Sequence, residues 1–221
     1  MPASAEAGLR GASLRGASLR DTGAMPRIVA GAARGRRLEA PEGTTTRPTS
    51  DRTREALFSA LESMLGSWHG RTFLDLYAGS GAVGLEAASR GAASVVLVES
   101  DQKALRVLRA NVAHLALAGA SVVGGPVEKY AQGRPPAVDV VFADPPYSMP
   151  TPQVHEVLVG LLAAGTVAEG TLVVVERATR RSDWGWPAGL VGVRDKAYGE
   201  GTLWYGRAAG PTLDEAPVRT S

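Results

Sequence analysis

The sequence contains no cysteine, only three lysines among its 24 basic residues, and no apolar run long enough to span a bilayer. Without thiols the chain forms neither disulfides nor thiolate metal sites, so we expect a protein of the reducing cytoplasm. The histidines, His69, His114 and His155, are too scattered for metal ligation, and we expect neither a metal nor a membrane partner. The length of 221 residues allows one sizeable domain with appendages, which we expect to be a monomer.

Positive charge is concentrated in one stretch of the chain. The net charge is only +2, but residues 27–54 hold seven arginines against three acids. Such a local excess of arginine predicts contacts with phosphates, and therefore a nucleic-acid partner. The candidate RNA-binding residues are Arg27, Arg34, Arg36, Arg37, Arg47, Arg52 and Arg54.

The two ends of the chain differ in composition from the middle. The pentapeptide LRGAS at residues 9–13 is repeated at 14–18, but two copies of so short a unit cannot bury a core. We expect disorder over residues 1–24 and in a tail over 209–221. Between them we expect a basic β-hairpin and loop over 25–50, with strands at 27–30 and 36–39, followed by a larger domain over 51–208.

From residue 51 onward, helical periodicity alternates with apolar runs of β character. We expect strands at 73–76, 94–99, 121–123, 139–143, 171–176, 190–193 and 202–205. We expect helices that start near residue 51, cover 83–90, run from 101 to about 118, and lie around 154–162. The alternation predicts an α/β fold with a doubly wound, seven-stranded and mostly parallel sheet.

The stretch from Phe73 to Gly84 combines a strand, a glycine turn and the start of a helix. Gly79, Gly81 and Gly84 follow the pattern G-x-G-x-x-G, which lets a ligand approach the backbone and the free N–H groups of the helix. Glu99 ends the next strand, twenty residues after Gly79, where an acid suits a ribose diol. The stretch therefore predicts a site for a nucleotide-type cofactor.

Asp75 favours one kind of cofactor over another. Its carboxylate lies four residues before Gly79, where it would repel a pyrophosphate and attract an ammonium or a sulfonium. S-adenosylmethionine carries both cations, so we expect this cofactor and not NAD. The alternatives are an aspartate that only caps the turn through backbone N–H groups, and a protein that is an NAD-linked oxidoreductase.

The sequence Asp-Pro-Pro-Tyr at residues 144–147 directly follows a predicted strand. Its prolines lack N–H donors, so the Asp144 carboxylate and the Pro145 carbonyl remain as acceptors, which suits an amine substrate. Tyr147 offers a ring on which a flat base can stack. The alternative is a structural turn in which Pro145 and Pro146 fix the backbone and Tyr147 packs.

Motifs over residues 25–207 resemble those of a known family. Residues 75–81 (DLYAGSG) and 144–147 (DPPY) are similar to motifs I and IV of class I, S-adenosylmethionine-dependent amino-methyltransferases, which have a Rossmann-like fold. More specific segments resemble the RsmD family: residues 27–31 (RIVAG), 34–38 (RGRRL), 47–58 (RPTSDRTREALF) and 198–199 (YG).

The resemblance implies an enzyme that methylates the exocyclic N2 amine of a guanosine in 16S ribosomal RNA, free or in an assembling small ribosomal subunit. It implies catalytic roles for Asp144, Pro145, Pro146 and Tyr147. It implies cofactor contacts from Asp75, Tyr77, Gly79, Ser80, Gly81, Glu99, Ser100, Val127 and Asp144. The alternatives are an adenine-N6 or other nucleic-acid amino-methyltransferase, and a non-catalytic RNA-binding protein on the same scaffold.

The chain departs from the family pattern at two places. Many such enzymes have an acid after the third strand to hold the adenine amine, whereas residues 125–127 are Gly-Pro-Val, which leaves the contact to the backbone or to Glu128. Family members commonly show Tyr-Gly-x-Thr near the C-terminus, and this chain has Tyr-Gly-Glu-Gly-Thr at residues 198–202.

Overall fold

The computed structural model describes residues 26–41, 50–181 and 184–210. Residues 1–24, Arg47 and all but the first two residues of the expected tail lie outside the described residues. The helices are α1 (Asp51–Leu65), α2 (Ala82–Ser89), α3 (Gln102–Leu115), α4 (Val127–Gln132) and α5 (Thr151–Ala163). The strands are β1 (Thr72–Leu76), β2 (Ser94–Glu99), β3 (Ala120–Gly124), β4 (Val140–Ala143), β5 (Leu172–Ala178), β6 (Leu190–Tyr198) and β7 (Gly201–Ala208).

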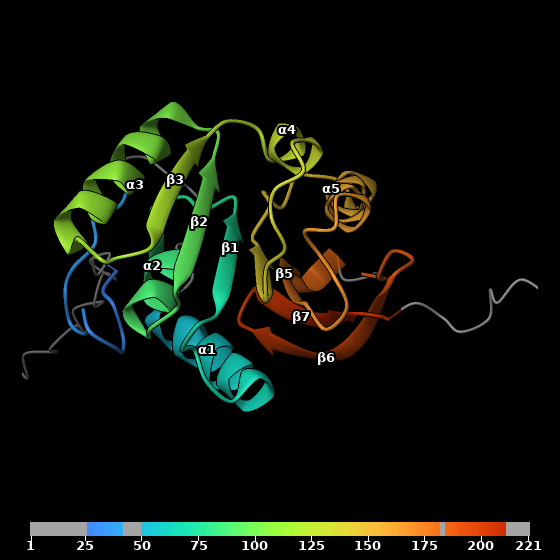
Figure 1. The fold of residues 1–221 in the computed structure, drawn as a ribbon, viewed down its shortest axis with the longest axis horizontal. Coiled ribbons are helices and arrows are strands. Elements are labelled where there is room, and N and C mark those ends of the chain that lie inside the picture. Colours follow the sequence, from blue (N-terminus) through green and yellow to red (C-terminus); the bar gives the residue numbers. More distant parts are fainter. Residues whose placement is uncertain (1–25, 42–49, 182–183, 211–221) are drawn as a thin grey trace, which may run out of the picture.

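The strands form one sheet of seven in the order β3-β2-β1-β4-β5-β7-β6, which confirms the predicted fold (Figure 1). Pairing is parallel from β3 to β5, and β7 runs antiparallel to both β5 and β6. The chain builds outward from β1 to β3 and then returns to place β4 on the other side of β1. In such sheets a ligand binds beyond the carboxyl ends of the strands at this switch in order.

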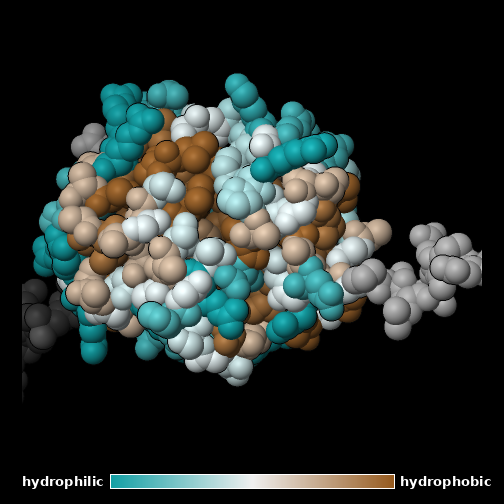
Figure 2. Space-filling view, viewed as in Figure 1, coloured by the Kyte–Doolittle hydropathy of each residue, from teal (hydrophilic) through white to brown (hydrophobic). Residues whose placement is uncertain are grey.

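Helices cover both faces of the sheet because the central strands are apolar on both sides. One core joins residues of α1, α2 and α3 to one face, and a second core joins α4 and α5 to the other. Neither of the latter two helices covers the outer part of β2 and β3, where Val96 and Val123 are partly exposed and the surface is apolar (Figure 2). Among the described residues, no helix is long and apolar enough to cross a membrane.

Helix α1 begins where the sequence predicts. Ser50 is its N-cap, and the Ser50 hydroxyl accepts a hydrogen bond from the backbone N–H of Thr53. Leu57, Phe58 and Leu61 are fully buried on its inner face. This apolar face holds α1 against α2 and the sheet.

Several predicted boundaries were wrong. Helix α3 ends at Leu115 and not near residue 118, because Ala116 adopts a left-handed conformation with φ 49°. Strand β6 is longer than predicted because its pairing with β7 continues to Tyr198. The predicted hairpin over 27–39 is present but short: Arg27 and Arg37 form an antiparallel bridge, and the N–H groups of Ile28 and Leu38 donate to the carbonyls of Arg36 and Pro26. Helix α4 was not predicted, because six residues are too few to show helical periodicity.

The N-terminal segment 26–40 packs into the main core. Ile28, Ala33 and Leu38 are at most 2% exposed and join the same core as α1 and α2. The segment runs along α3 in Figure 1, where it is blue. The N-terminal segment therefore shares one hydrophobic core with the larger domain.

Candidate active site

The register of the parallel strands brings four side chains into one row. Leu76 of β1 pairs with Val98 of β2 on one side and with Ala143 of β4 on the other. Ala143 in turn pairs with Val175 of β5. The residues that follow these four lie side by side at the carboxyl edge of the sheet, in the order Glu99, Tyr77, Asp144 and Glu176.

The glycine turn after β1 has the conformation that the motif predicts. Gly79 and Gly81 have φ 57° and φ 83°, which glycine adopts without strain. A Cβ on Gly81 would lie 2.4 Å from the Cδ1 atom of Leu108, so no larger residue fits there. A Cβ on Gly79 would meet no atom within 4 Å, which leaves this backbone open to a ligand.

Glu99 is fixed by hydrogen bonds from the backbone. Its Oε2 accepts from the N–H of Gly79 at 2.8 Å, and its Oε1 accepts from the N–H groups of Ser100 and Asp101 at 2.7 Å. These bonds tie the glycine turn to the end of β2. A carboxylate accepts about four hydrogen bonds, so the group keeps capacity for a ligand. Contact with a ribose stays a prediction.

Asp75 is buried inside the sheet and not displayed at its edge. Its residue is 1% exposed, and its Oδ2 accepts a hydrogen bond of 2.7 Å from the N–H of Gly84 in the first turn of α2. Burial raises the pKa of Asp75 to about 7; the Gly84 bond opposes the rise and the charge of Glu99 adds to it. The observed role is thus close to the alternative, an aspartate that caps the turn. Contact with a cofactor stays a prediction.

Asp144 is an acid with acids for neighbours. The residue is partly buried, and this desolvation raises the pKa of Asp144 well above its ordinary value. The negative charges of Glu176 and Asp75 raise this pKa further, and Arg177 lowers it. Within the described part of the chain, no group donates a hydrogen bond to this carboxylate. The group is therefore poised to accept from a donor outside the protein.

Glu176 lies at the end of the row opposite Glu99, and Tyr147 contacts it there. Tyr147 is 41% exposed, and its hydroxyl donates a hydrogen bond of 3.2 Å to Oε1 of Glu176. Burial, with the charges of Glu176 and Asp144, raises the pKa of Tyr147, so it remains neutral. Neither Glu176 nor the nearby Gly201 was singled out from the sequence. Glu176 looked like the end of an apolar strand, and only the register of β5 with β4 places it in the site.

The loop after Pro146 is held by residues of two strands. The Arg177 guanidinium donates a hydrogen bond of 2.6 Å to the carbonyl of Met149. The Tyr77 hydroxyl contacts the Met149 sulfur at 3.5 Å, and Tyr77 has a left-handed φ of 61° that turns the chain away from β1. Burial raises the pKa of Tyr77 to about 12, with a contribution from the charge of Glu128. These contacts fix the position of the segment 144–147.

The other predicted cofactor residues are placed differently. Ser100 is exposed at the edge of the sheet, but the Val127 side chain is buried in the core, which leaves only its backbone for a ligand. The carbonyl of Ser80 accepts a hydrogen bond from Asn111 of α3, which also bonds both backbone groups of Glu39. The sequence analysis missed Asn111, although a lone amide on the apolar face of a helix was a usable signal.

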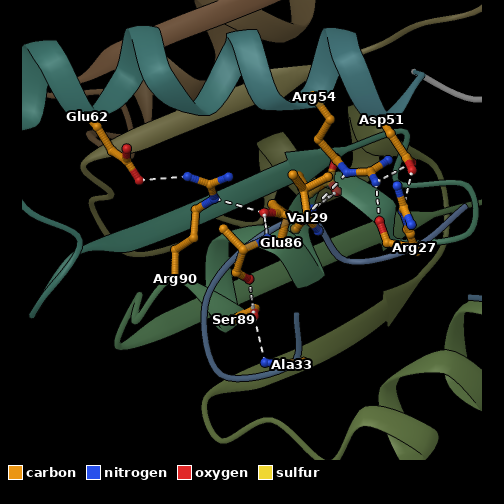
Figure 3. Close-up of polar contacts among 12 residues, drawn as sticks. Arg27, Val29, Ala33, Asp51, Arg54, Glu62, Glu86, Ser89 and Arg90 are labelled. Carbon is orange, nitrogen blue, oxygen red and sulfur yellow. Dashed lines mark hydrogen bonds and ion pairs between the residues drawn. The ribbon is translucent and has the colours of Figure 1, made fainter. Parts of the chain in front are cut away.

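The prediction that Arg54 binds RNA was wrong, because its side chain is fully buried. It bonds Asp51 at 2.8 Å and the carbonyl of Arg27, and its Nε lies 3.6 Å from Oε2 of Glu86 (Figure 3). Arg54 thus fastens the N-terminal segment to α1 and α2. A buried guanidinium enclosed by acids has no surface to offer to a phosphate.

The other described arginines of the basic stretch are exposed: Arg27, Arg34, Arg36, Arg37 and Arg52. Arg36 also donates hydrogen bonds to the carbonyls of Leu115 and His114 and so caps α3. The turn 31–35 bonds Ser89 at the end of α2, so it lies near the amino ends of the strands, opposite the row of acids. The turn with Arg34 thus lies away from Tyr147, whereas Glu39, two residues after Arg37, reaches the glycine turn through Asn111.

A hollow of about 390 Å³ lies at the amino ends of β1, β4 and β5, on the opposite edge of the sheet. The ion pair of Arg71 with Asp139, 2.8 Å apart, forms part of its wall. None of the predicted catalytic or cofactor residues lines it. The motifs and the switch in strand order place the candidate active site at the other edge.

The sheet order, the glycine turn after β1 and the Asp-Pro-Pro-Tyr segment after β4 define a Rossmann-like methyltransferase of class I. A family model described as Conserved hypothetical protein 95 matches residues 26–207. The chain belongs to this family, the RsmD family, and the predicted resemblance is confirmed.

Individual relatives and structures agree with this assignment. Ribosomal RNA small subunit methyltransferase D of Escherichia coli (strain K12) is 37% identical over 150 residues, which cover 68% of this chain and 73% of the relative. The solved structure of the E. coli protein yhhF is 33% identical, with a TM-score of 0.73, and covers 83% of this chain and 98% of its own. The solved structure of a hypothetical protein of Thermus thermophilus is 40% identical, with a TM-score of 0.66. The match covers 81% of this chain and 97% of that protein.

Proposed function

We propose that this protein transfers a methyl group from S-adenosylmethionine to the N2 amine of a guanosine in 16S ribosomal RNA. The observation that carries the proposal is the Asp144 carboxylate, which is enclosed, lacks a donor among the described residues and lies in one row with Glu99. The E. coli relative named ribosomal RNA small subunit methyltransferase D supports the choice of ribosomal RNA.

The residues at this edge fit S-adenosylmethionine better than a dinucleotide. Glu99 and Asp144 lie at this edge with Asp75 buried behind them, and the raised pKa values of the two aspartates mean that a nearby cation would favour their charged forms. Such a cluster of acids suits a sulfonium and an ammonium and disfavours a pyrophosphate. Glu99 would hold the ribose, and the open backbone at Gly79 would lie against the cofactor. S-adenosylmethionine, when bound, supplies the electrophilic methyl group.

The chemistry of the amine falls to the segment 144–147. An exocyclic amine is a weak nucleophile because its lone pair is delocalised into the base. The Asp144 carboxylate and the Pro145 carbonyl would accept its two protons, which favours a pyramidal nitrogen with its lone pair free. Tyr147 would stack on the base, worth about 1–3 kcal/mol. As the new C–N bond forms, the bond from the methyl carbon to sulfur would break with S-adenosylhomocysteine as the leaving group, and one amine proton would pass to Asp144 or to water.

The RNA would be held by the exposed arginines of the N-terminal stretch. Arg27, Arg34, Arg37 and Arg52 are exposed, and Arg36 adds its charge beside them. Because the turn with Arg34 lies away from Tyr147, we infer that this part of the stretch binds a more distant part of the RNA, while Asp144 and Tyr147 hold the target base. The substrate is free 16S RNA or an assembling small subunit, the protein acts in the cytoplasm, and it acts as a monomer.

The test combines ligand binding with product analysis. Calorimetry should detect binding of S-adenosylmethionine and not of NAD. Mass spectrometry of 16S RNA nucleosides from a deletion strain, with and without the gene restored, should show loss and return of N2-methylguanosine. Loss of N6-methyladenosine would favour the adenine alternative. An unchanged nucleoside profile with intact RNA binding would favour a non-catalytic protein.

A further inference from the structure

Glu176 is an acid of the active site that the motifs leave without a role. It follows Val175 on β5 just as Asp144 follows Ala143 on β4, and those two preceding residues are paired. Glu176 is 8% exposed and accepts a hydrogen bond from the Tyr147 hydroxyl. The pairing of β4 with β5 places the two acids side by side, and the charge of Glu176 raises the pKa of Asp144.

The position of Glu176 in the row is informative. Glu99, beside the glycine turn, lies at one end, and Glu176 lies at the other, with Asp144 between them. A base whose amine lies at Asp144 can therefore place one of the two ring nitrogens beside that amine against Glu176. The Tyr147 hydroxyl is bonded to Glu176, so the stacking ring and this carboxylate are set relative to each other.

The backbone of β7 closes against the same carboxylate. A Cβ on Gly201 would lie 2.6 Å from Oε1 of Glu176 and 3.1 Å from the Tyr147 hydroxyl. A larger residue at 201 would have to displace the Glu176 carboxylate or the Tyr147 hydroxyl, so the second glycine of the Tyr-Gly-Glu-Gly-Thr segment at residues 198–202 leaves both groups in place. The close contact limits the positions that the Glu176 carboxylate can occupy.

The N2 amine of guanine has two ring neighbours, N1 with a proton and N3 without one, and a carboxylate pairs only with the N1 side. Guanine carries a proton on N1, next to the N2 amine, whereas adenine has an unprotonated N1 that accepts hydrogen bonds. A carboxylate accepts from a donor and repels a lone pair. A site built to hydrogen-bond a donor rejects an analogue without it by large factors, because its own group is left unpaired.

We propose that Glu176 selects guanine by accepting a hydrogen bond from N1–H, while Asp144 accepts from the N2 amine. The inference rests on the proposed function, and it explains how the active site would select guanine over a base with an unprotonated N1. A carboxylate accepts about four hydrogen bonds, so N1–H and the Tyr147 hydroxyl can share Glu176. Glu176 is then a specificity-determining residue, with Tyr147 as its neighbour and support.

The experiment uses a short RNA in which the target guanosine is replaced by 2-aminopurine. This base keeps the 2-amine but has an unprotonated N1. We expect the wild-type protein to prefer guanosine by about 100-fold or more in kcat/KM. In Glu176→Gln the side-chain amide can rotate and donate to N1, so the preference should fall below about tenfold, mainly through a gain on 2-aminopurine. The fluorescence of 2-aminopurine also reports stacking without turnover and should be quenched more strongly by the variant.

Tyr147→Phe is the matched control, since it removes the hydroxyl that bonds Glu176 and keeps the ring. We expect it to slow both substrates in parallel and to preserve the preference for guanosine. An unchanged preference in a folded Glu176→Gln protein would overturn the inference, as would an equal loss of preference in Tyr147→Phe. Methylation of guanosine by the wild type must be seen first; its absence would instead overturn the proposed function.

Discussion

Glu86 of α2 and Asp144 after β4 are both enclosed acids, but they differ in the number of donors around them. Glu86 is fully buried and accepts hydrogen bonds from the N–H groups of Val29 and Ala30, at 2.7 and 2.9 Å. It also accepts from Nε of Arg90 at 2.8 Å, and Arg54 lies 3.6 Å away. Nearly all of its capacity is used inside the protein (Figure 3).

Asp144 has the opposite surroundings. Its neighbours Glu176 and Asp75 are acids, and no donor in the described parts of the chain bonds its carboxylate. An enclosed acid that is fully paired stabilises the fold, whereas one without donors costs stability and is a sign of a functional site. The comparison teaches that these two acids of one domain should respond to substitution in opposite ways.

The largest effect is expected at Glu86. Glu86→Ala should destabilise the protein by about 3–5 kcal/mol, because it leaves two backbone N–H groups and Nε of Arg90 without their acceptor and removes the buried negative charge beside Arg54. Urea unfolding followed by circular dichroism measures this loss. Glu62→Ala is the control: it removes the other carboxylate bound to Arg90, but that side chain is 42% exposed, so we expect a loss of about 1 kcal/mol or less. Equal unfolding midpoints for the two variants would contradict the contrast.

Asp144→Asn should act on rate and not on stability. We expect single-turnover methylation to fall by about 100-fold or more, since the lost interaction matters as the amine becomes nucleophilic. The unfolding midpoint should stay the same or rise, because a negative charge beside Glu176 is removed. Affinity for both substrates should change little. A variant with near wild-type rate would remove Asp144 from the role of amine acceptor.

Asp75 lies between the two extremes, since it is buried with a single donor. Its pKa is raised from 3.8 to about 7 on folding, so the folded state binds the proton more tightly than the unfolded state. Stability from this group is present below pH 4 and is lost as the pH rises to 7, by about 2–3 kcal/mol between pH 5 and 7. Asp75→Asn, which keeps an oxygen for Gly84, should remove this part of the pH dependence. Urea unfolding at several pH values measures this dependence. If the free energy of unfolding changed with pH by the same amount in the wild type and in Asp75→Asn, the prediction would be wrong.

The sequence predicted the sheet and the segment 144–147 well, because apolar runs and motifs are local features. The prediction failed for residues whose role depends on the register between two strands or on the face of a helix that they occupy. Glu176 gains its role only beside Asp144. Arg54 could have been recognised as buried, since Arg54, Leu57 and Leu61 share one face of α1 at helical spacing. Arg54 was predicted to bind RNA because of its charge alone, whereas its position on the helix places it in the core.

The smallest effect is expected for the exposed arginines, whose replacement should change RNA binding but not stability. Arg34 and Arg37 are exposed, and no described residue bonds their side chains, whereas Arg36 caps α3. Replacing Arg34 and Arg37 together with alanine should weaken RNA binding and flatten its salt dependence by up to about two units, because each phosphate contact releases counterions. Affinity for S-adenosylmethionine and the unfolding midpoint should not change.

Arg36→Ala is the matched variant for this test, because it also removes a positive charge but takes away a helix cap. We expect it to lower stability by about 1 kcal/mol and to change the salt slope less than the double variant does. Fluorescence anisotropy with labelled RNA at several salt concentrations measures the slopes. If the double variant kept the wild-type slope and methylated RNA fully, the arginines of this turn would have no part in recognition. The basic stretch would then be a structural element like Arg54, held to α2 by Glu86.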